Sequence, residues 1–345
     1  MLGLAERMGG SVLMAARSDS VTLSGFVGSS RLAWTGAHSW HMGERVWSTT
    51  NPRLDTWISL LHTLNLDPTP VLVSALCADF EGDQWSMPCV HAADVWTSYG
   101  IVVEELCVWR PLLAHLVEQL DRGHAVLVEV DEFHLPDMVG SSYQRAHAKT
   151  AIAVTGYDRE AHSLRYIHGA FGGDVGGEDL DAMLTAGIGS AQLPPTTTLV
   201  RLDRIAVRSP AERALIAVAL ARLHGTRFPT QNPIRTFGDA LRSQGVWLAG
   251  GDAEHYQRWA FATLHQCGAA FELGSDVCAF LADHGQSVGG AAAHLRAIAR
   301  AARSLHKRLV RVPQSGRMPD ISQTVDEMAR SWDDAMLVLR PAYGI

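Results

Sequence analysis

A predicted β-hairpin that begins at His147 constrains the fold of this chain more than any other stretch. Apolar residues fill 151–154, bounded by His147 on one side and by the turn residues of 156–158 on the other. A second short run, 163–169, returns after a polar break. Apolar runs of strand length between turn residues are typical of neighbouring antiparallel strands. The pattern therefore predicts a buried strand with His147 at its mouth and a returning strand that ends in His168.

Composition limits the classes of protein to which the chain can belong. Of its 345 residues, 47% are hydrophobic, which is enough for a sizeable core, and the net charge is -7. A mildly acidic chain without basic runs argues against nucleic acid or an anionic membrane as the main partner. We therefore expect neither a nucleic-acid partner nor a membrane partner.

The cysteines and the first residues bear on the compartment. The chain has five cysteines, an odd number, and no C-x-x-C pair, which is typical of reduced thiols in a cytosolic protein. The apolar patch at 11–16 is too short and too closely flanked by charge for a signal peptide. No apolar run approaches the length of a membrane span. These features favour a cytoplasmic protein.

Periodicity divides the chain near residue 205. Residues 1–205 have the pattern of an α+β domain with helices first and antiparallel strands after them, and residues 206–345 that of an α-helical bundle. Residues 1–46 are expected to form strands and loops. The helices of the first domain are expected near 52–64 and 109–120, and its strands near 124–131, 147–158, 164–167 and 198–202. The helices of the second domain are expected near 209–225, 256–271, 295–309 and 321–336.

His147 is the first candidate for a catalytic residue. A neutral imidazole at a strand start can take and return a proton near neutral pH. The alternative is a histidine whose ring is satisfied by a backbone carbonyl. A third group has to orient a catalytic imidazole, and His168 or Asp158 could supply it. His168 is better placed, because Asp158 lies in the turn at the far end of the strand.

The nucleophile that such a site needs is missing from the predicted helix start. A helix N-terminus lowers the pKa of a thiol, so a catalytic cysteine is expected in a first turn. That position holds Pro52, which Asn51 precedes as a typical N-cap residue. The hydroxyls of 48–50 lie just upstream, and one of them could attack if His147 reached it, but Thr50 and Asn51 are interpreted as helix-capping residues. Cys77 and Cys89 flank an acidic loop and could approach a cleft, but each is interpreted as a small buried or incidental residue.

The acidic loop, Asp79-Phe80-Glu81-Gly82-Asp83-Gln84-Trp85, holds three carboxylates. Their spacing does not match a calcium-binding loop. The sequence also has neither a zinc-like Cys/His spacing nor a phosphate-binding glycine loop. We expect no metal and no cofactor bound by the chain itself. On the strand 124–131, Glu129 and Asp131 share one face, which either lines a polar cleft or meets solvent.

Several segments together resemble a little-characterised bacterial family of unknown function. The resemblance covers most of residues 40–280, and the acidic loop is its most specific element. At the level of fold, members of that family resemble double-glycine bacteriocin-processing peptidases and the butirosin-pathway acyltransferase. The resemblance therefore implies a papain-like, cysteine-protease-type domain over residues 1–205. The segments that carry it are 47–62, 79–85, 108–113, 128–131, 135–137, 147–150, 259–264 and 268–273.

The chain departs from this family's pattern at two positions of the implied Cys-His-Asn triad. Pro52 stands where the family has the cysteine, and Gly169 stands where it has the asparagine. His147 is retained. Ordinary thiol catalysis is therefore not expected at this site.

The resemblance implies an acyltransferase of natural-product biosynthesis, because genes of the family lie beside carrier proteins and synthetase-like amino acid:carrier protein ligases. Such an enzyme moves an aminoacyl group from the phosphopantetheine thioester of an acyl or peptidyl carrier protein to an amine or hydroxyl of a small-molecule acceptor. His147 is expected as the general base, and Asn51 as an oxyanion donor. The expected catalytic residues are His147, Asn51 and His168. The expected substrate-binding residues are Asp83, Trp85, Glu129, Arg145 and Lys149.

Two other functions stay open. A catalytically degenerate relative would bind an aminoacyl carrier protein without turnover, and the loss of two triad positions favours it. The other, a cysteine peptidase or amidase, is the function least compatible with the missing thiol, because an amide is harder to cleave than a thioester. The first two functions differ in one geometric requirement, since catalysis needs His147 to face an open cleft near the start of the 53–64 helix.

Overall fold

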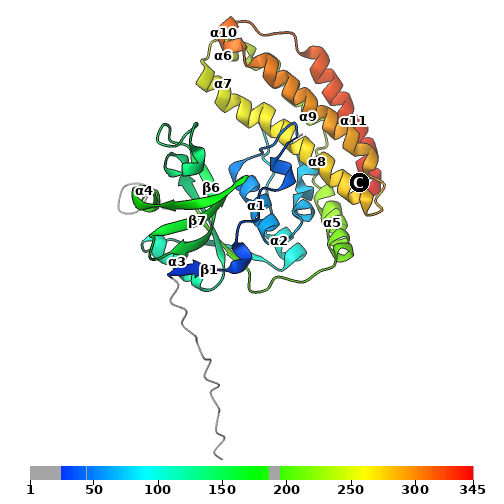
Figure 1. The fold of residues 1–345 in the computed structure, drawn as a ribbon. Coiled ribbons are helices and arrows are strands. Elements are labelled where there is room, and N and C mark those ends of the chain that lie inside the picture. Colours follow the sequence, from blue (N-terminus) through cyan, green and yellow to red (C-terminus); the bar gives the residue numbers. More distant parts are fainter. Residues whose placement is uncertain (1–24, 44, 186–194, 345) are drawn as a thin grey trace, which may run out of the picture.

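An antiparallel sheet of seven strands forms the centre of the N-terminal half. We describe it from a computed structural model, which covers residues 25–43, 45–185 and 195–344 (Figure 1). The strand order is β4-β9-β5-β6-β7-β8, and β1 pairs with the end of β6. The strands are β1 (Phe26–Gly28), β4 (Val102–Leu106), β5 (Ala125–Asp131), β6 (Lys149–Asp158), β7 (Ser163–His168), β8 (Phe171–Gly176) and β9 (Thr197–Arg201).

The predicted hairpin is formed by β6 and β7. Ala153 is paired with Ile167 and Tyr157 with Leu164, with a bulge between Val154 and Gly156. The carboxylate of Asp158 accepts hydrogen bonds from two backbone N–H groups of the turn that follows. The expectation of a turn-forming Asp158 is therefore confirmed.

Helices cover both faces of the sheet. Helix α1 (Pro52–Thr63) packs on one face against β6 and β7. Helices α3 (Leu112–Asp121) and α4 (Gly177–Thr185) cover the other face. The valines of β5 belong to the core under α3 and α4, whereas Leu127 belongs to the core on the α1 side. Because side chains alternate along a strand, Glu129 and Asp131 lie on the α1 side as well.

The C-terminal half is helical, as the periodicity predicts. The capping box at Ser209 and Glu212 is present, and α9 and α11 lie side by side (Figure 1). Helix α7 continues through one π turn, η6 (Phe261–His265), into α8. Among the helices that the structure describes, none combines the length and the apolar character of a membrane span. The helices are α5 (Pro210–Gly225), α6 (Pro233–Ala249), α7 (Ala253–Ala260), α8 (Gln266–Asp283), α9 (Gly289–Leu309), α10 (Val312–Ser315) and α11 (Ser322–Tyr343).

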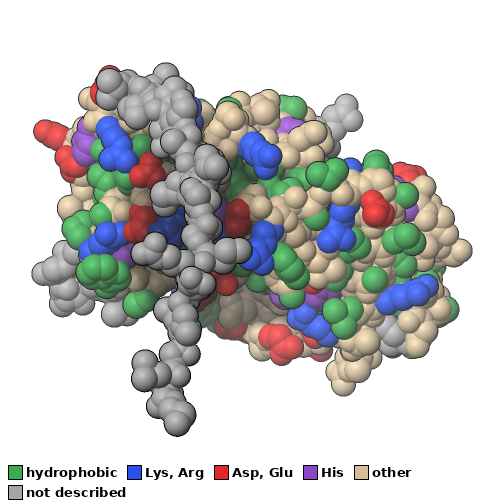
Figure 2. All heavy atoms as spheres, turned by 90° about the horizontal axis from the view of Figure 1, so that it is seen from below, with side chains coloured by type: hydrophobic (Ala, Val, Ile, Leu, Met, Phe, Trp, Pro, Cys, Tyr) green, Lys and Arg blue, Asp and Glu red, His purple; other side chains and the backbone are tan. Residues whose placement is uncertain are grey.

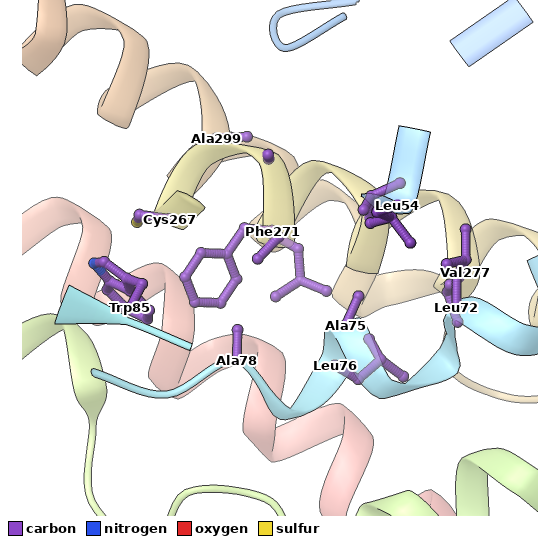
Figure 3. Packing of buried hydrophobic residues seen from close by; sticks show 14 of the residues in the cluster. Leu54, Leu72, Ala75, Leu76, Ala78, Trp85, Cys267, Phe271, Val277 and Ala299 are labelled. Atoms are coloured by element: carbon purple, nitrogen blue, oxygen red, sulfur yellow. The ribbon is translucent and has the colours of Figure 1, made fainter. Parts of the chain in front are cut away.

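One hydrophobic core joins the two halves. The cluster that begins with Leu32 and Trp47 continues without a break through α8, α9 and α11. Figure 3 shows Phe271 of α8 among side chains of the N-terminal half, Trp85, Ala78 and Leu76. Two domains that fold alone would each enclose a separate core. The pattern change near 205 therefore separates two kinds of secondary structure around a shared core.

Several elements were missed by the sequence patterns. They include α2 (Ala92–Tyr99), the 3-10 helix η3 (Thr69–Cys77), β4 and β8, and the hairpin of β2 (Phe80–Glu81) and β3 (Gln84–Trp85) inside the acidic loop. Trp109, expected in a helix, precedes α3 and is 78% exposed. The expected apolar patch at 11–16 lies outside the described residues.

Candidate functional site

An exposed imidazole and a carboxylate lie together at the end of the sheet. His147 precedes β6, and Asp131 is the last residue of the neighbouring β5. The distance from His147 Nδ1 to Asp131 Oδ2 is 2.6 Å, and the His147 ring stacks on Phe133 at 4.6 Å between centroids. The His147 side chain is 74% exposed. With Nδ1–H donated to Asp131, Nε2 is the nitrogen that can exchange a proton with a ligand.

Asp131 is built to stay ionised beside this ring. It accepts hydrogen bonds from the backbone N–H groups of Phe133 and Ala148 and from His147. Partial burial disfavours the carboxylate, but these hydrogen bonds outweigh it, so the pKa of Asp131 lies below its ordinary value. Asp131, and not His168 or Asp158, is thus the group that orients His147.

Lys149 and Glu129 form the next pair along the same face. Lys149 Nζ lies 3.1 Å from Glu129 Oε1. Partial burial disfavours the Glu129 carboxylate, but hydrogen bonds from Thr196 and Lys149 prevail and lower the pKa of Glu129. The Lys149 ammonium is already paired, whereas Arg145 is exposed and, among the residues that the structure describes, makes one long 3.5 Å contact, to the Gly140 carbonyl. Of these two expected substrate-binding residues, Arg145 is therefore the more available to bind a phosphate group.

Asn51 caps α1. Its Oδ1 accepts the backbone N–H of Leu54 at 3.0 Å, and its Nδ2 donates to the Pro88 carbonyl at 3.0 Å. The residue is 7% exposed, and Pro52 occupies the first helical position. Asn51 and Pro52 thus follow the pattern of a helix start and tie it to the loop before α2.

The start of α1 and His147 lie at different points of the sheet. Arg53, in the first turn of α1, donates to Thr198 Oγ1 at 3.0 Å, and Thr198 is paired with Leu127. Asp131 lies four residues beyond Leu127 on the same strand, which corresponds to roughly 13 Å. Among the described residues, Asn51 and His147 form no hydrogen bond with each other: Asn51 bonds Leu54 and Pro88, and His147 bonds Asp131.

His168 belongs to a buried network on the opposite face of the sheet. Its Nδ1 lies 2.7 Å from Asp137 Oδ2, and its Nε2 lies 2.8 Å from Thr150 Oγ1. Tyr166 donates its hydroxyl to the same Asp137 carboxylate at 2.6 Å. The order hydroxyl, imidazole, carboxylate matches that of a hydrolase triad. However, Thr150 is only 3% exposed, so a substrate cannot reach its hydroxyl and the network is structural.

The acidic loop lies against the helical half, away from His147. Trp85 is 2% exposed and packs edge-on against Phe237 and Phe271. It is therefore a core residue, and the expectation that it contacts a substrate is wrong. Asp83 lies on the exposed turn and lines a groove of about 290 Å³ with residues of α6 and α7, among them Trp247.

One pair of functional groups was not recognised in the sequence. Cys89 Sγ lies 3.7 Å from His91 Nε2 in the loop before α2. The only sequence signal is the C-x-H spacing, which is too common to be specific. Within the described ranges, no group of three or more His, Cys, Asp or Glu residues could hold a metal ion.

The surface carries charges of both signs. On the face drawn in Figure 2, Lys and Arg side chains are interspersed with Asp and Glu side chains and with hydrophobic ones. This face therefore presents no extended area of a single charge among the residues described.

Comparison with known proteins gives two matches that together span most of the chain. Residues 36–202 match the family model described as the DUF1839 N-terminal domain, and residues 211–341 match that of the DUF1839 C-terminal domain. No curated protein matches the sequence.

Proposed function

Since the chain belongs to the DUF1839 family through both of its parts, we propose for this family member an acyltransferase activity centred on the Asp131–His147 pair. The acyl donor is an aminoacyl thioester on the phosphopantetheine of a carrier protein, and the acceptor is an amine or hydroxyl of a small molecule. The observation that carries the proposal is an exposed imidazole whose Nδ1 is held by a carboxylate at 2.6 Å. This arrangement suits a general base.

The proposed step needs no covalent enzyme intermediate. His147 Nε2 takes the proton of the acceptor amine or hydroxyl while that group attacks the thioester carbonyl carbon. The tetrahedral intermediate then breaks its C–S bond, and the imidazolium returns the proton to the leaving thiolate. A thioester is already activated, so a missing nucleophile at Pro52 does not prevent this route. Asp131 fixes the tautomer and stabilises the imidazolium that forms.

Two features support the carrier-protein substrate. The packing of α1 on an antiparallel sheet is compatible with the papain-like fold that the sequence resemblance implies. Arg145, exposed two residues before His147, offers a guanidinium for the phosphate of phosphopantetheine.

A second candidate function is binding of the charged carrier protein without catalysis. The observation that favours it is the start of α1, where Asn51 and Pro52 serve as helix cap and first residue instead of a nucleophile and an oxyanion donor. The two candidates make opposite predictions for turnover.

The test is a transfer assay with an aminoacyl carrier protein and candidate amines, followed by intact-mass measurement of the carrier and the product. We expect His147→Gln to lower the rate by about 100-fold or more while binding of the carrier is kept. Exposed His284 on the helical half provides the matched control, and His284→Gln is expected to act like the wild type. A wild-type chain that binds the carrier but never transfers supports the second candidate. Transfer that His147→Gln leaves unchanged rules out the assigned base.

A Pro52→Cys variant measured beside the wild type tests the role of the missing thiol. A covalent acyl adduct on the new cysteine is expected only if the start of α1 is open to the thioester. Transfer by the wild type at a comparable rate would show that the thiol is dispensable.

A further inference from the structure

The loop between β3 and α2 holds a thiol and an imidazole in a fixed relative position. Cys89 is exposed, and its Sγ lies 3.7 Å from His91 Nε2, within hydrogen-bonding distance for sulfur. Two anchors hold the loop: Asn51 Nδ2 donates to the Pro88 carbonyl at 3.0 Å, and Ser74 Oγ donates to the Cys89 carbonyl at 3.1 Å. The short distance is thus enforced from outside the loop.

A buried histidine and carboxylate lie behind His91. The His91 ring stacks on His224 with 5.1 Å between centroids. His224 Nε2 is 2.7 Å from Asp94 Oδ2, and both side chains are almost fully buried. Burial lowers the pKa of His91, and His224 and Arg227 act in the same direction, whereas the Asp94 carboxylate favours a positive charge on the ring.

Both groups rest in their neutral forms. Burial raises the pKa of the Cys89 thiol, against the influence of Arg227, and burial lowers the pKa of His91. A neutral thiol next to a neutral imidazole is the arrangement in which the base removes the proton as sulfur attacks. Without His91, the raised pKa would leave Cys89 a poor nucleophile.

A small cavity is lined by Cys89 and His91, and also by Cys77. Its volume is about 70 Å³. One water needs at least about 10–15 Å³ by this measure, so the cavity has room for a group of a few heavy atoms. Arg227 contributes a positive charge to the lining, and Met87 and Ala75 contribute apolar surface. The space suits a small acyl group.

We propose that Cys89, with His91 as its base, is a nucleophilic thiol that accepts a small acyl group from a thioester. Sγ forms a bond to the carbonyl carbon while its proton passes to His91 Nε2. The C–S bond of the donor then breaks, and the proton moves from His91 to the leaving thiolate. One thioester is exchanged for another, so no oxidant or further reactant is needed.

This site is separate from the one assigned to His147. The reaction needs no atom of the Asp131–His147 pair. The result of the carrier-protein assay therefore neither supports nor contradicts it. The position is adjacent to the start of α1, because Asn51 links the helix cap to Pro88.

The test treats the full chain with S-acetyl-N-acetylcysteamine and follows acetylation by intact mass and peptide mapping. Cys107 is the matched control, since it is the other exposed cysteine in the same molecule. We expect Cys89 to be acetylated about tenfold faster than Cys107 or more, which is a modest part of what a general base contributes. Cys89→Ser should abolish the fast reaction, and Cys107→Ser should leave it unchanged.

His91→Gln decides the role of the imidazole. In this variant, the rate at Cys89 should fall to that of Cys107 or below, while the thermal unfolding midpoint shows that the chain is folded. His91→Asn serves as the second variant if the first does not fold. Equal rates at the two cysteines of the wild type, or a fast Cys89 that both His91 variants retain, would overturn the proposal.

Discussion

The carboxylate of Glu272 accepts the backbone N–H of Trp47 at 2.7 Å, and this hydrogen bond fastens the C-terminal helices to the segment before α1. The second oxygen of Glu272 accepts the N–H of Val46 at 3.0 Å. Glu272 lies on α8 and is 5% exposed. Without it, the buried N–H of Trp47 and the partly buried N–H of Val46 would lose their acceptor, so Glu272 helps to determine how the two halves meet.

Replacement of Glu272 should therefore destabilise the whole chain. We expect Glu272→Ala to lower the free energy of unfolding by about 1–3 kcal/mol for each N–H left unpaired. Glu272→Gln keeps one acceptor oxygen and should lose less. Urea unfolding monitored by tryptophan fluorescence measures the difference. Equal stability of Glu272→Ala and the wild type would show that water replaces the carboxylate.

Gly268 should not tolerate a side chain. A Cβ at this position would lie 2.1 Å from Nε1 of Trp47, whose indole N–H donates to the Ala299 carbonyl at 3.0 Å. We expect Gly268→Ala to cost about 1–3 kcal/mol or more, because the bulky indole is held on both sides. Gly290→Ala in α9 is the control, since its nearest neighbour would be Val338 at 3.7 Å. The thermal unfolding midpoint should fall clearly in Gly268→Ala and should fall much less, or rise, in Gly290→Ala.

The stability of the chain should fall as the pH drops from about 6.5 to about 4. Burial and the nearby His62 lower the pKa of His38 to about 4 from 6.5. The unfolded chain therefore binds more protons than the folded one in this window, so acid favours unfolding. His38 Nδ1 also accepts the N–H of Trp40, which a protonated ring cannot do.

His38→Asn tests this assignment, because asparagine can still accept that hydrogen bond but does not titrate. The variant should show a shallower loss of stability between pH 6.5 and 4 than the wild type. Urea unfolding at several pH values measures the slope. Identical slopes would show that His38 does not account for the acid sensitivity.

Asp137 and Asp131 should differ in role, although each bonds a histidine: Asp137 stabilises the fold, and Asp131 orients His147. The Asp137 side chain is 6% exposed and satisfies both His168 and Tyr166, whereas that of Asp131 is 28% exposed. We expect Asp137→Ala to cost about 2–5 kcal/mol, since it leaves buried donors unpaired. Asp131→Ala should cost less than about 1 kcal/mol but lower any transfer rate. A large stability loss in Asp131→Ala would contradict the functional assignment of that pair.

Asn51 caps α1 and also bonds the Pro88 carbonyl, and substitutions can separate these two roles. Asn51→Ala removes the cap and the tie to Pro88, and should cost about 1–2 kcal/mol. Asn51→Ser keeps a capping oxygen without reaching the Pro88 carbonyl, so it should recover most of this stability. If the tie positions the loop, the acetylation rate of Cys89 should still drop in Asn51→Ser. Chemical unfolding and the acetylation assay measure the two effects independently.

The secondary structure around the site was largely predictable, because its signals are local. Asn51-Pro52 predicts the start of α1, and the alternation from Val126 to Asp131 predicts both faces of β5. The same N-cap signature, Asn232-Pro233, precedes α6, which the periodicity had not indicated. Short elements such as β4 were missed, since an alternation of apolar and polar residues over so few positions cannot be distinguished from a loop.

The sequence alone determined that this chain is an α+β fold with a helical C-terminal region and that an imidazole lies at the mouth of a strand. Periodicity, caps and turn residues act within a few positions, so they can be recognised in the sequence itself. Only the tertiary structure decided that Asp131 holds His147, that His168 is buried with Asp137, and that Cys89 meets His91 in front of His224. Asp131 meets His147 through the pairing of β5 with β6, Asp137 lies 31 positions from His168, and His224 lies 130 positions from Asp94. No local pattern of residues encodes these contacts.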